Sequence, residues 1–173
     1  MAMHIAGMEV NWPCRALEIY VSGCTRNCPG CHNPELQKYG VGKKWQRWIR
    51  DNSHALKYEW SMLADKLWIV GGDLLCQPPE DAVEFLKALH RTVPEMTICV
   101  WTGEDDWTLI DPDIFKLADS FKLGSYKKDL PGRKTSYPDD ELGTVPVRLA
   151  SENQYFFFTA PDDREVHKHG VTV

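Results

Sequence analysis

Residues 21–33 read VSGCTRNCPGCHN and place three cysteines, Cys24, Cys28 and Cys31, within eight positions. Glycine and proline between the cysteines let the backbone turn tightly, so the loop can direct three sulfur atoms to one point. A cubane cluster has four irons, and three thiolate ligands leave one iron open to substrate. The loop is therefore predicted to hold a [4Fe-4S] cluster with one iron available for chemistry.

A structural zinc site is the alternative for this loop, because three cysteines and one histidine, here His32, form an accepted tetrahedral ligand set. Adjacent ligands at Cys31 and His32 fit such a site poorly. Structural zinc sites usually take two separated pairs of ligands, and no second C-x-x-C pair lies elsewhere in the sequence. Iron is therefore the favoured metal.

The other three cysteines, Cys14, Cys76 and Cys99, stand alone in the sequence. Cys99 lies within an apolar segment, where a free thiol behaves as a small hydrophobic side chain. We expect none of the three to be a cluster ligand. Cys76 follows a double glycine, and its position is the one that would allow it to face the site.

The composition is that of an ordinary folded protein. The chain has 173 residues, of which 43% are hydrophobic and 26% are charged, and this fits one domain with a single core. The formal net charge of -5 provides no basic field for a nucleic-acid backbone. Residues 1–173 are therefore expected to form one domain that does not bind nucleic acid.

No segment of the sequence predicts membrane insertion or export. The longest apolar runs, such as Leu67 to Val70 and Tyr155 to Phe158, are far shorter than the roughly 20 residues that cross a bilayer. The amino terminus lacks the basic and apolar regions of a secretory signal. We expect a reducing, cytoplasmic location, where cysteines serve as ligands or free thiols rather than as disulfides.

Strands and helices are predicted to alternate. Five apolar runs have the length of strands: Leu17–Ser22, Lys66–Val70, Met96–Trp101, Ser120–Leu123 and Tyr155–Phe158. Helices are predicted within Lys43–Ala64, from Pro78-Pro79 onward, and over Asp111–Leu117. This alternation predicts an α/β fold, a parallel sheet with flanking helices. The polar segment Lys127–Gly143 is predicted to be a long loop, and the charged tail with His167 and His169 is expected to be solvated and inert.

On these residues the chain resembles the radical S-adenosylmethionine (radical SAM) enzymes, whose hallmark is C-x-x-x-C-x-x-C after a strand. Residues 10–15, VNWPCR, and residues 21–36, which include Cys-His-Asn-Pro-Glu, are similar to the opening of the anaerobic ribonucleoside-triphosphate reductase activating proteins. Residues 148–154, which end in Ser-Glu-Asn-Gln, are similar to their closing segment. The resemblance implies a partial (β/α) barrel of the radical SAM type, open on one side.

The resemblance also implies where S-adenosylmethionine binds. Gly71-Gly72-Asp73 corresponds to the turn that receives the amino group, and Thr102-Gly103 corresponds to residues on the ribose side. His32 and Asn33 correspond, by resemblance, to the residues beside the adenine, and Gly30 is also expected to contact the cofactor. Taken alone, the same residues are also typical of an ordinary turn, a strand end and a capped loop.

Two positions depart from the pattern of the activating proteins. Trp12 stands where glycine is usual, and a change there is expected to alter how the chain packs beneath the cluster. Leu123 stands where the resemblance predicts an acidic residue, and the neighbouring Lys122 is a candidate to compensate for it.

The activity implied by the resemblance is reductive cleavage of S-adenosylmethionine to methionine and a 5′-deoxyadenosyl radical. In the activating proteins this radical removes a hydrogen from a glycine of the large subunit of anaerobic ribonucleotide reductase. The implied partners are that glycyl-radical protein and a flavodoxin- or ferredoxin-type electron donor.

Three alternatives stay open on sequence alone. A short radical SAM enzyme can act on a small molecule, as the 7-carboxy-7-deazaguanine synthases do, with Lys127–Gly143 as a lid. The chain can also activate another glycyl-radical enzyme, such as pyruvate formate-lyase. Outside enzymes, it can be an iron–sulfur or zinc binding interaction module, although an electron carrier normally has four protein ligands on its cluster.

Overall fold

Seven strands pair into one sheet in the computed structural model, of which residues 2–159 are described. The four central strands run parallel: β2 (Ala16–Ser22), β4 (Lys66–Gly71), β5 (Thr97–Trp101) and β6 (Ser120–Leu123). The edge strands run antiparallel to their neighbours: β1 (His4–Asn11) and β3 (Lys43–Lys44) at one edge, and β9 (Tyr155–Phe158) at the other. The order is β3-β1-β2-β4-β5-β6-β9, so the predicted parallel sheet is confirmed at its centre and is mixed at its edges.

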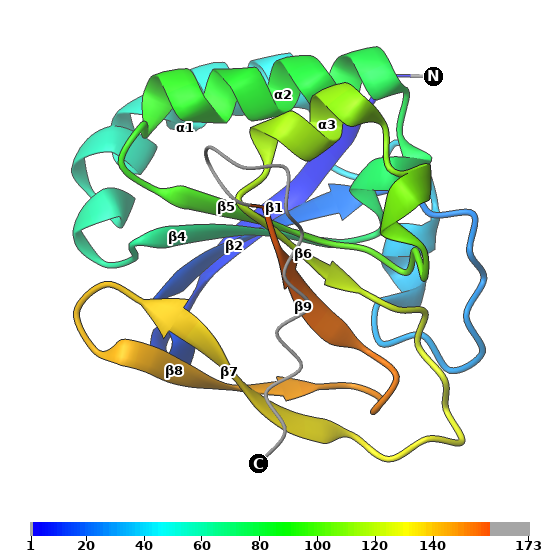
Figure 1. Ribbon diagram of the computed structural model, residues 1–173. Helices are drawn as coiled ribbons and strands as arrows, with labels where there is room; N and C mark the ends of the chain where they lie inside the picture. Colours follow the sequence, from blue (N-terminus) through cyan, green and yellow to red (C-terminus); the bar gives the residue numbers. More distant parts are fainter. Residues whose placement is uncertain (1, 160–173) are drawn as a thin grey trace.

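Three helices cover one face of this sheet (Figure 1). They are α1 (Trp45–Tyr58), α2 (Pro79–Thr92) and α3 (Pro112–Leu117). Helix α2 begins at a proline and has Glu80 and Asp81 in its first turn, where carboxylates favour the positive end of the helix. The carboxylate of Asp111 caps α3 by accepting the backbone N–H of Asp113 at 2.9 Å. The flanking helices predicted in these regions are confirmed.

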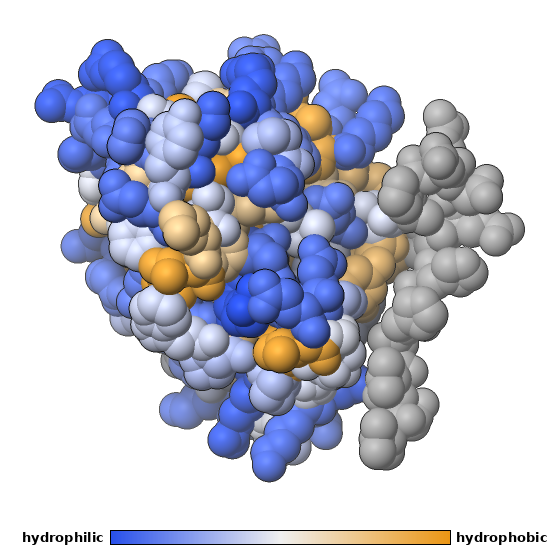
Figure 2. Space-filling model, turned by 90° about the vertical axis from the view of Figure 1, so that its left-hand side faces the viewer, coloured by the Kyte–Doolittle hydropathy of each residue, from blue (hydrophilic) through white to orange (hydrophobic). Residues whose placement is uncertain are grey.

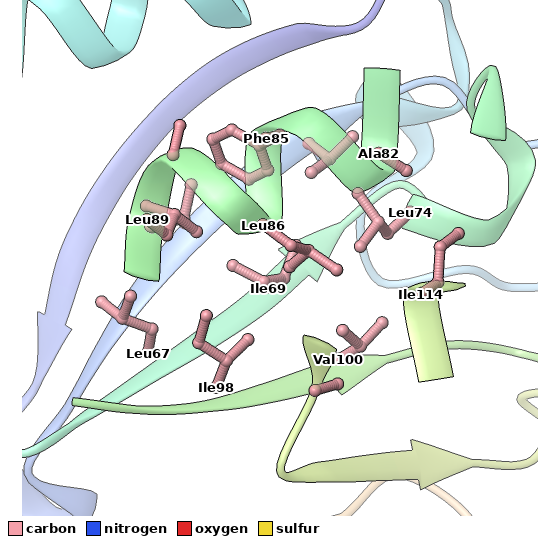
Figure 3. Packing of buried hydrophobic residues seen from close by; sticks show 14 of the residues in the cluster. Leu67, Ile69, Leu74, Ala82, Phe85, Leu86, Leu89, Ile98, Val100 and Ile114 are labelled. Atoms are coloured by element: carbon pink, nitrogen blue, oxygen red, sulfur yellow. The ribbon is translucent and has the colours of Figure 1, made fainter. Parts of the chain in front are cut away.

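The main core lies between α2 and the parallel strands. Apolar residues three and four positions apart form one face of α2: Ala82, Phe85, Leu86 and Leu89. Alternate residues of β4 and β5 meet this face: Leu67, Ile69, Ile98 and Val100 (Figure 3). All eight side chains are at most 1% exposed, and burial of such apolar surface is the principal force that stabilises a fold. The core therefore fixes the carboxyl ends of β4 and β5, which lead into the site.

A two-stranded ribbon lies on the side of the sheet opposite the helices (Figure 1). Its strands are β7 (Arg133–Asp139) and β8 (Gly143–Leu149), with Tyr137 paired opposite Val145. Apolar side chains of the ribbon pack against Trp68 and Phe156 of the sheet. The long loop predicted over Lys127–Gly143 is therefore wrong from residue 133 onward, because alternate residues of this polar segment are buried against the sheet.

Figure 2 shows a mostly hydrophilic face with several small, separate hydrophobic areas. No helix within residues 2–159 has the length and apolar character that a bilayer crossing requires. The tail with His167 and His169 lies outside the described residues, so the prediction for it stays a prediction.

Candidate functional site

One cavity lies where the four parallel strands end. It is lined by residues that follow or terminate β2, β4, β5 and β6, at the sheet edge where α/β proteins collect their ligands. Ten of the eleven predicted site residues line it: Cys24, Cys28, Cys31, His32, Asn33, Gly71, Gly72, Asp73, Thr102 and Gly103. The exception is Gly30, where an added Cβ would lie 3.2 Å from Lys128 Cδ, so this glycine faces a neighbouring loop instead.

Backbone hydrogen bonds hold the cysteine loop at the end of β2. The N–H of Gly23 donates to the carbonyl of Leu36 at 2.8 Å, and the N–H of Cys24 donates to that of Gln37 at 3.1 Å. Gly23 has a φ of 104°, and an added Cβ would lie only 2.3 Å from the ring of Tyr39. Glycine is therefore required here. The three loop cysteines are free and half-buried, so their sulfurs are available as ligands.

The double glycine lies directly against the cysteine loop. A Cβ at Gly71 would lie 2.7 Å from the carbonyl oxygen of Val21, and one at Gly72 would lie 2.6 Å from that of Gly23. The N–H of Gly72 donates to the Val21 carbonyl at 2.7 Å. Any side chain at either glycine would therefore separate the turn from the cysteine loop.

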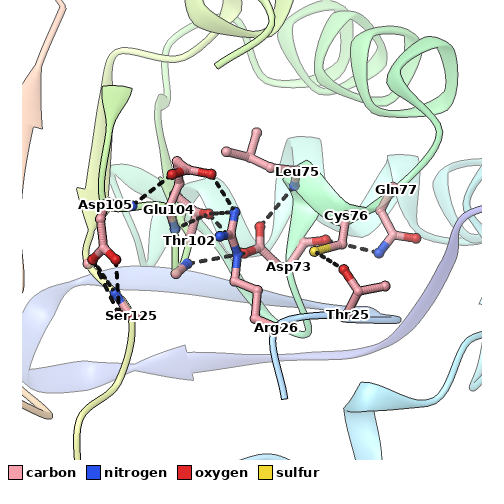
Figure 4. Close-up of polar contacts among 12 residues, drawn as sticks. Thr25, Arg26, Asp73, Leu75, Cys76, Gln77, Thr102, Glu104, Asp105 and Ser125 are labelled. Atoms are coloured by element: carbon pink, nitrogen blue, oxygen red, sulfur yellow. Dashed lines mark hydrogen bonds and ion pairs between the residues drawn. The ribbon is translucent and has the colours of Figure 1, made fainter. Parts of the chain in front are cut away.

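Asp73 joins the ends of two strands to the cysteine loop (Figure 4). Its buried carboxylate oxygen Oδ2 accepts the hydroxyl of Thr102 at 2.8 Å and the backbone N–H of Gly103 at 3.1 Å. The guanidinium of Arg26, from the cysteine loop, donates to the same oxygen and forms an ion pair. The three predicted positions thus belong to one network, in which protein donors already engage the carboxylate.

Arg26 was not among the predicted site residues, and nothing in the sequence distinguishes it from an ordinary charged loop residue. Its Nη2 also donates to Glu104 Oε2 at 3.2 Å. Burial opposes the charge on Arg26, but the two carboxylates raise its pKa above the usual value, so it stays charged. The side chain lies over Gly103, where an added Cβ would be 2.6 Å from Arg26 Cδ.

Lys122 places a second cation at the cavity. Its side chain is buried in β6, where Nζ donates to the carbonyls of Thr102 at 3.2 Å and Gly124 at 3.4 Å. The ammonium also lies 5.7 Å from the centre of the Trp101 ring. Burial lowers the pKa of Lys122 to about 8, although the charge of Asp73 acts in the opposite direction. A lysine within an apolar strand is the sequence signal for this residue.

Of the three cysteines that stand alone in the sequence, Cys76 approaches the cysteine loop. The ligand atoms of Cys24, Asp73 and Cys76 all lie within 4.8 Å of one another. The hydrogen bond between the two cysteines raises the pKa of Cys24 and lowers that of Cys76 to about 6. Cys14 and Cys99 are buried in the apolar cluster between the sheet and the β7–β8 ribbon.

The closing Ser-Glu-Asn-Gln segment forms the wall of the cavity beside β6. Gln154 Nε2 donates to the carbonyl of Gly124 at 3.1 Å, and Asn153 Nδ2 donates to that of Ser125 at 2.8 Å. At the rim, the rings of His32 and Tyr126 lie 4.7 Å apart. The segment identified by resemblance thus has a structural role, which is to hold the end of β6 at the site.

The expectation for Trp12 is wrong. Its side chain is 64% exposed, and it follows β1 at the end where Asn11 pairs with Ala16, the first residue of β2. The cysteine loop leaves the other end of β2, after Ser22. Trp12 therefore does not pack beneath the cluster.

Comparison with known proteins gives a matching family and several similar proteins. The model of the 4Fe-4S single cluster domain family matches residues 11–137. Anaerobic ribonucleoside-triphosphate reductase-activating proteins are similar to the chain: that of Salmonella typhi is 27% identical over 124 residues, which cover 70% of this chain and 80% of the relative. The protein of that name from Escherichia coli K12 is 26% identical over 126 residues, with the same coverage. That of Enterobacteria phage T4 is 26% identical over 127 residues, 72% of this chain and 80% of the relative. No solved structure matches the chain significantly.

Proposed function

The chain belongs to the 4Fe-4S single cluster domain family, and on this basis we propose that it is a radical SAM activase of an anaerobic ribonucleoside-triphosphate reductase. The proposal agrees with the printed names of its relatives. One observation supports it above the others: the three cysteines, the Gly-Gly-Asp turn and the Thr-Gly pair line one cavity. Three cysteine ligands also suit a cluster whose fourth iron binds substrate, which a zinc site or an electron carrier does not need.

When bound, a [4Fe-4S] cluster supplies the electron that cleaves S-adenosylmethionine into methionine and a 5′-deoxyadenosyl radical. Cys24, Cys28 and Cys31 hold three of the irons in this proposal. The chain's remaining residues orient the substrate and exclude water, which is the general division of work between a protein and its cofactor. The fold we propose is the partial (β/α) barrel of the radical SAM type.

The charged residues of the cavity suit the carboxylate and the amino group of S-adenosylmethionine. Lys122 is the buried cation that best suits the carboxylate, since its ammonium has only two backbone carbonyls and a ring as partners. Asp73 and the carbonyls of Gly71 and Gly72 suit the amino group. Because Arg26 already pairs with Asp73, binding of the amino group requires that the two cations share this carboxylate or that Arg26 moves toward Glu104.

The rim of the cavity suits the adenosine part of S-adenosylmethionine. The paired rings of His32 and Tyr126 offer an aromatic surface on which an adenine can stack. Asn33, Thr102 and Gly103 supply polar groups on the same cavity. Gly30 leaves room for the adjoining loop rather than for the cofactor, so we assign it a backbone role.

The proposed protein substrate is the glycine-containing loop of a large anaerobic ribonucleotide reductase subunit, and the electron donor is a flavodoxin or a ferredoxin. A sheet that does not close leaves one side of the cavity accessible to such a loop. Lys128 lies against Gly30 of the cysteine loop, while residues 133–143 of the predicted lid belong to the β7–β8 ribbon. We further propose that residues 1–173 act as one domain in the cytoplasm.

Electron paramagnetic resonance tests the proposal. The protein is loaded with iron and sulfide without oxygen, reduced, and mixed with S-adenosylmethionine with and without a candidate reductase. We expect a cluster signal that changes with S-adenosylmethionine, followed by a glycyl doublet on the reductase. The Cys28→Ser variant is expected to lose both, whereas the Cys99→Ser variant, changed at a buried thiol away from the cavity, keeps them. Formation of 5′-deoxyadenosine without a protein radical would contradict the activase and favour a small-molecule substrate.

A further inference from the structure

The feature that the proposed function leaves unexplained is a fourth thiol beside the cluster loop. Cys76 ends the 3-10 turn Leu74–Cys76, which follows the Gly-Gly-Asp turn. Its sulfur accepts the hydroxyl of Thr25 at 3.4 Å, and Thr25 is the residue next to Cys24 (Figure 4). The sulfurs of Cys24 and Cys76 lie within 4.8 Å of each other. Two thiols from segments far apart in sequence are thus in direct proximity.

Several contacts fix these two segments against each other. The carbonyl of Gly23 accepts the side-chain amide of Gln77 at 2.7 Å and the backbone N–H of Asp73 at 3.1 Å. The hydroxyl of Tyr39 donates to the carbonyl of Cys76 at 2.8 Å. Gly23 and Thr25, on either side of Cys24, are therefore both bonded to the segment that carries Cys76, so the approach of the two sulfurs is a built feature of the fold.

Cys76 is the thiol from outside the cysteine loop that Cys24 approaches. The group of close ligand atoms that contains Cys24 also contains Cys76 and Asp73, and among residues 2–159 neither Cys28 nor Cys31 belongs to it. Cys14 and Cys99 are 5% and 0% exposed, so they are far less accessible to an oxidant in solution. Cys24 and Cys76 are both half-buried and remain within reach of a small oxidant.

We propose that Cys24 and Cys76 form a reversible disulfide when the cluster is not bound, and that this disulfide prevents cluster insertion. The inference rests on the proposed cluster site, because it assigns Cys24 to two competing states. A low-molecular-weight disulfide is the oxidant. One protein thiolate attacks it and releases a small thiol, and the second protein thiolate then attacks the mixed disulfide and releases another. The protein loses two electrons and two protons, and one small disulfide becomes two small thiols.

Such a bond would serve a protein that works without oxygen. A free thiol exposed to oxidants proceeds beyond sulfenic acid to sulfinic acid, which is irreversible for most proteins, whereas a disulfide is returned to thiols by reductants. The disulfide would therefore protect Cys24 from irreversible oxidation. It would also prevent iron from binding to a site that lacks the Cys24 ligand. Reduction would free the ligand and permit loading.

Trypsin separates the relevant cysteines, which makes the disulfide directly testable. Cleavage after arginine and lysine places Cys24 in peptide 16–26, Cys76 in peptide 67–87, and Cys28 with Cys31 in peptide 27–38. The full chain, without iron, is treated with oxidised glutathione, alkylated and digested without reductant. We expect peptide 16–26 joined to peptide 67–87, two hydrogens lighter than the sum. A Cys24 joined to peptide 27–38, with Cys76 alkylated, would overturn the proposal.

Iron uptake supplies the second measurement. Oxidised wild-type protein is expected to bind at least about fivefold less iron than reduced protein, because a cluster held by two cysteines is poorly retained, and dithiothreitol should restore uptake. Oxidised Cys76→Ser should load as well as its reduced form, whereas the control Cys99→Ser should behave as wild type. If oxidation lowered iron uptake by Cys76→Ser as much as by wild type, the proposed disulfide would be refuted. Both measurements omit S-adenosylmethionine and the reductase, so their outcome is independent of the activase test.

Discussion

Lys66 Nζ lies 2.7 Å from Asp139 Oδ2, and the two side chains are 2% and 0% exposed. The pair joins the first residue of β4 to the last residue of β7. The other oxygen of Asp139 accepts the backbone N–H groups of Glu141 and Leu142 at 3.0 Å and 2.8 Å, which holds the turn between β7 and β8. One carboxylate thus both shapes the ribbon and fastens it to the sheet, at the end of the strands opposite the cysteines.

Replacing this carboxylate should destabilise the fold. Asp139→Asn removes one of the two carboxylates that pair with the buried Lys66 ammonium and leaves Asp65 as the other, and we expect a loss of about 3 kcal/mol in the free energy of unfolding at neutral pH. Denaturant titration measures it. Asp140→Asn, a matched change at an exposed neighbour, should cost less than about 0.5 kcal/mol. A similar loss in both variants would show that the buried pair is not responsible.

The same pair predicts an acid dependence. Burial opposes the charge of Asp139, but the hydrogen bond from Lys66 and those from the turn lower its pKa below the ordinary 3.8. A group with a lowered pKa stabilises the folded state above the unfolded-state pKa and loses that effect as the pH falls toward the folded-state pKa. The difference between wild type and Asp139→Asn should therefore be full above about pH 5 and shrink below about pH 4. A difference in the free energy of unfolding that stays constant across that pH range would argue against this role of Asp139.

Lys122→Met should weaken binding of S-adenosylmethionine. Hydrogen bonds to charged groups contribute about 1.5–3 kcal/mol, so we expect affinity to fall by about ten- to a hundredfold in calorimetric titration of cluster-loaded protein. Because the pKa of Lys122 is about 8, the ratio of the two affinities should be largest below that pH and decrease above it. Lys116→Met, at an exposed lysine of α3, is the control. Equal affinities for wild type and Lys122→Met would remove this residue from the site.

Thr102→Val tests the network around Asp73. The hydroxyl of Thr102 donates to Asp73 at 2.8 Å and accepts the N–H of Glu104 at 3.0 Å, so the valine removes one of the donors to Asp73 and leaves the N–H of Glu104 without this acceptor. We expect affinity for S-adenosylmethionine to fall by about five- to thirtyfold, because each unsatisfied group costs about 1–3 kcal/mol. Thr97→Val, at the exposed start of the same strand, should bind as wild type does. Loss of binding in both would point to β5 rather than to the network.

Leu86→Ala measures how much α2 contributes to stability. Leu86 is fully buried against β4 and β5 (Figure 3), and removal of a buried leucine side chain leaves a cavity that costs about 2–5 kcal/mol. The exposed Leu109→Ala should change the free energy of unfolding by less than about 0.5 kcal/mol. The two variants are compared by denaturant unfolding, and a small loss for Leu86→Ala would mean that the core collapses around the missing side chain.

Elements with a strong apolar period were predictable from the sequence. Lys66–Val70 became β4 with one added residue, and Asp111 caps α3 as the start of the predicted helix. The β7–β8 ribbon was missed because its buried face includes Tyr137 and Asp139 within a run rich in charge and proline. Aspartate is rarely buried without a partner, and Lys66 supplies that partner from a distant strand. No local pattern contains that information.

The residues of the site also divide into those that the sequence predicted and those that it did not. The cysteines, the double glycine and Thr102 occupy recognisable motifs at strand ends, and topology brings such ends together. The contacts of Arg26 and Cys76 depend on how the cysteine loop folds back over the Gly-Gly-Asp turn. That approach is set by Gly23 and Gly72, whose backbones nearly touch. Sequence spacing alone does not predict which side chains of the cysteine loop and of the Gly-Gly-Asp turn come into contact.

The cavity draws its walls from residues as far apart as Cys24 and Gln154. A ribosome releases the chain from its amino end, so the three cysteines leave it more than a hundred residues before Gln154 is made. During that interval the cysteine loop has neither the strand ends nor the closing segment around it. The complete lining of the cavity thus exists only after synthesis has passed Gln154.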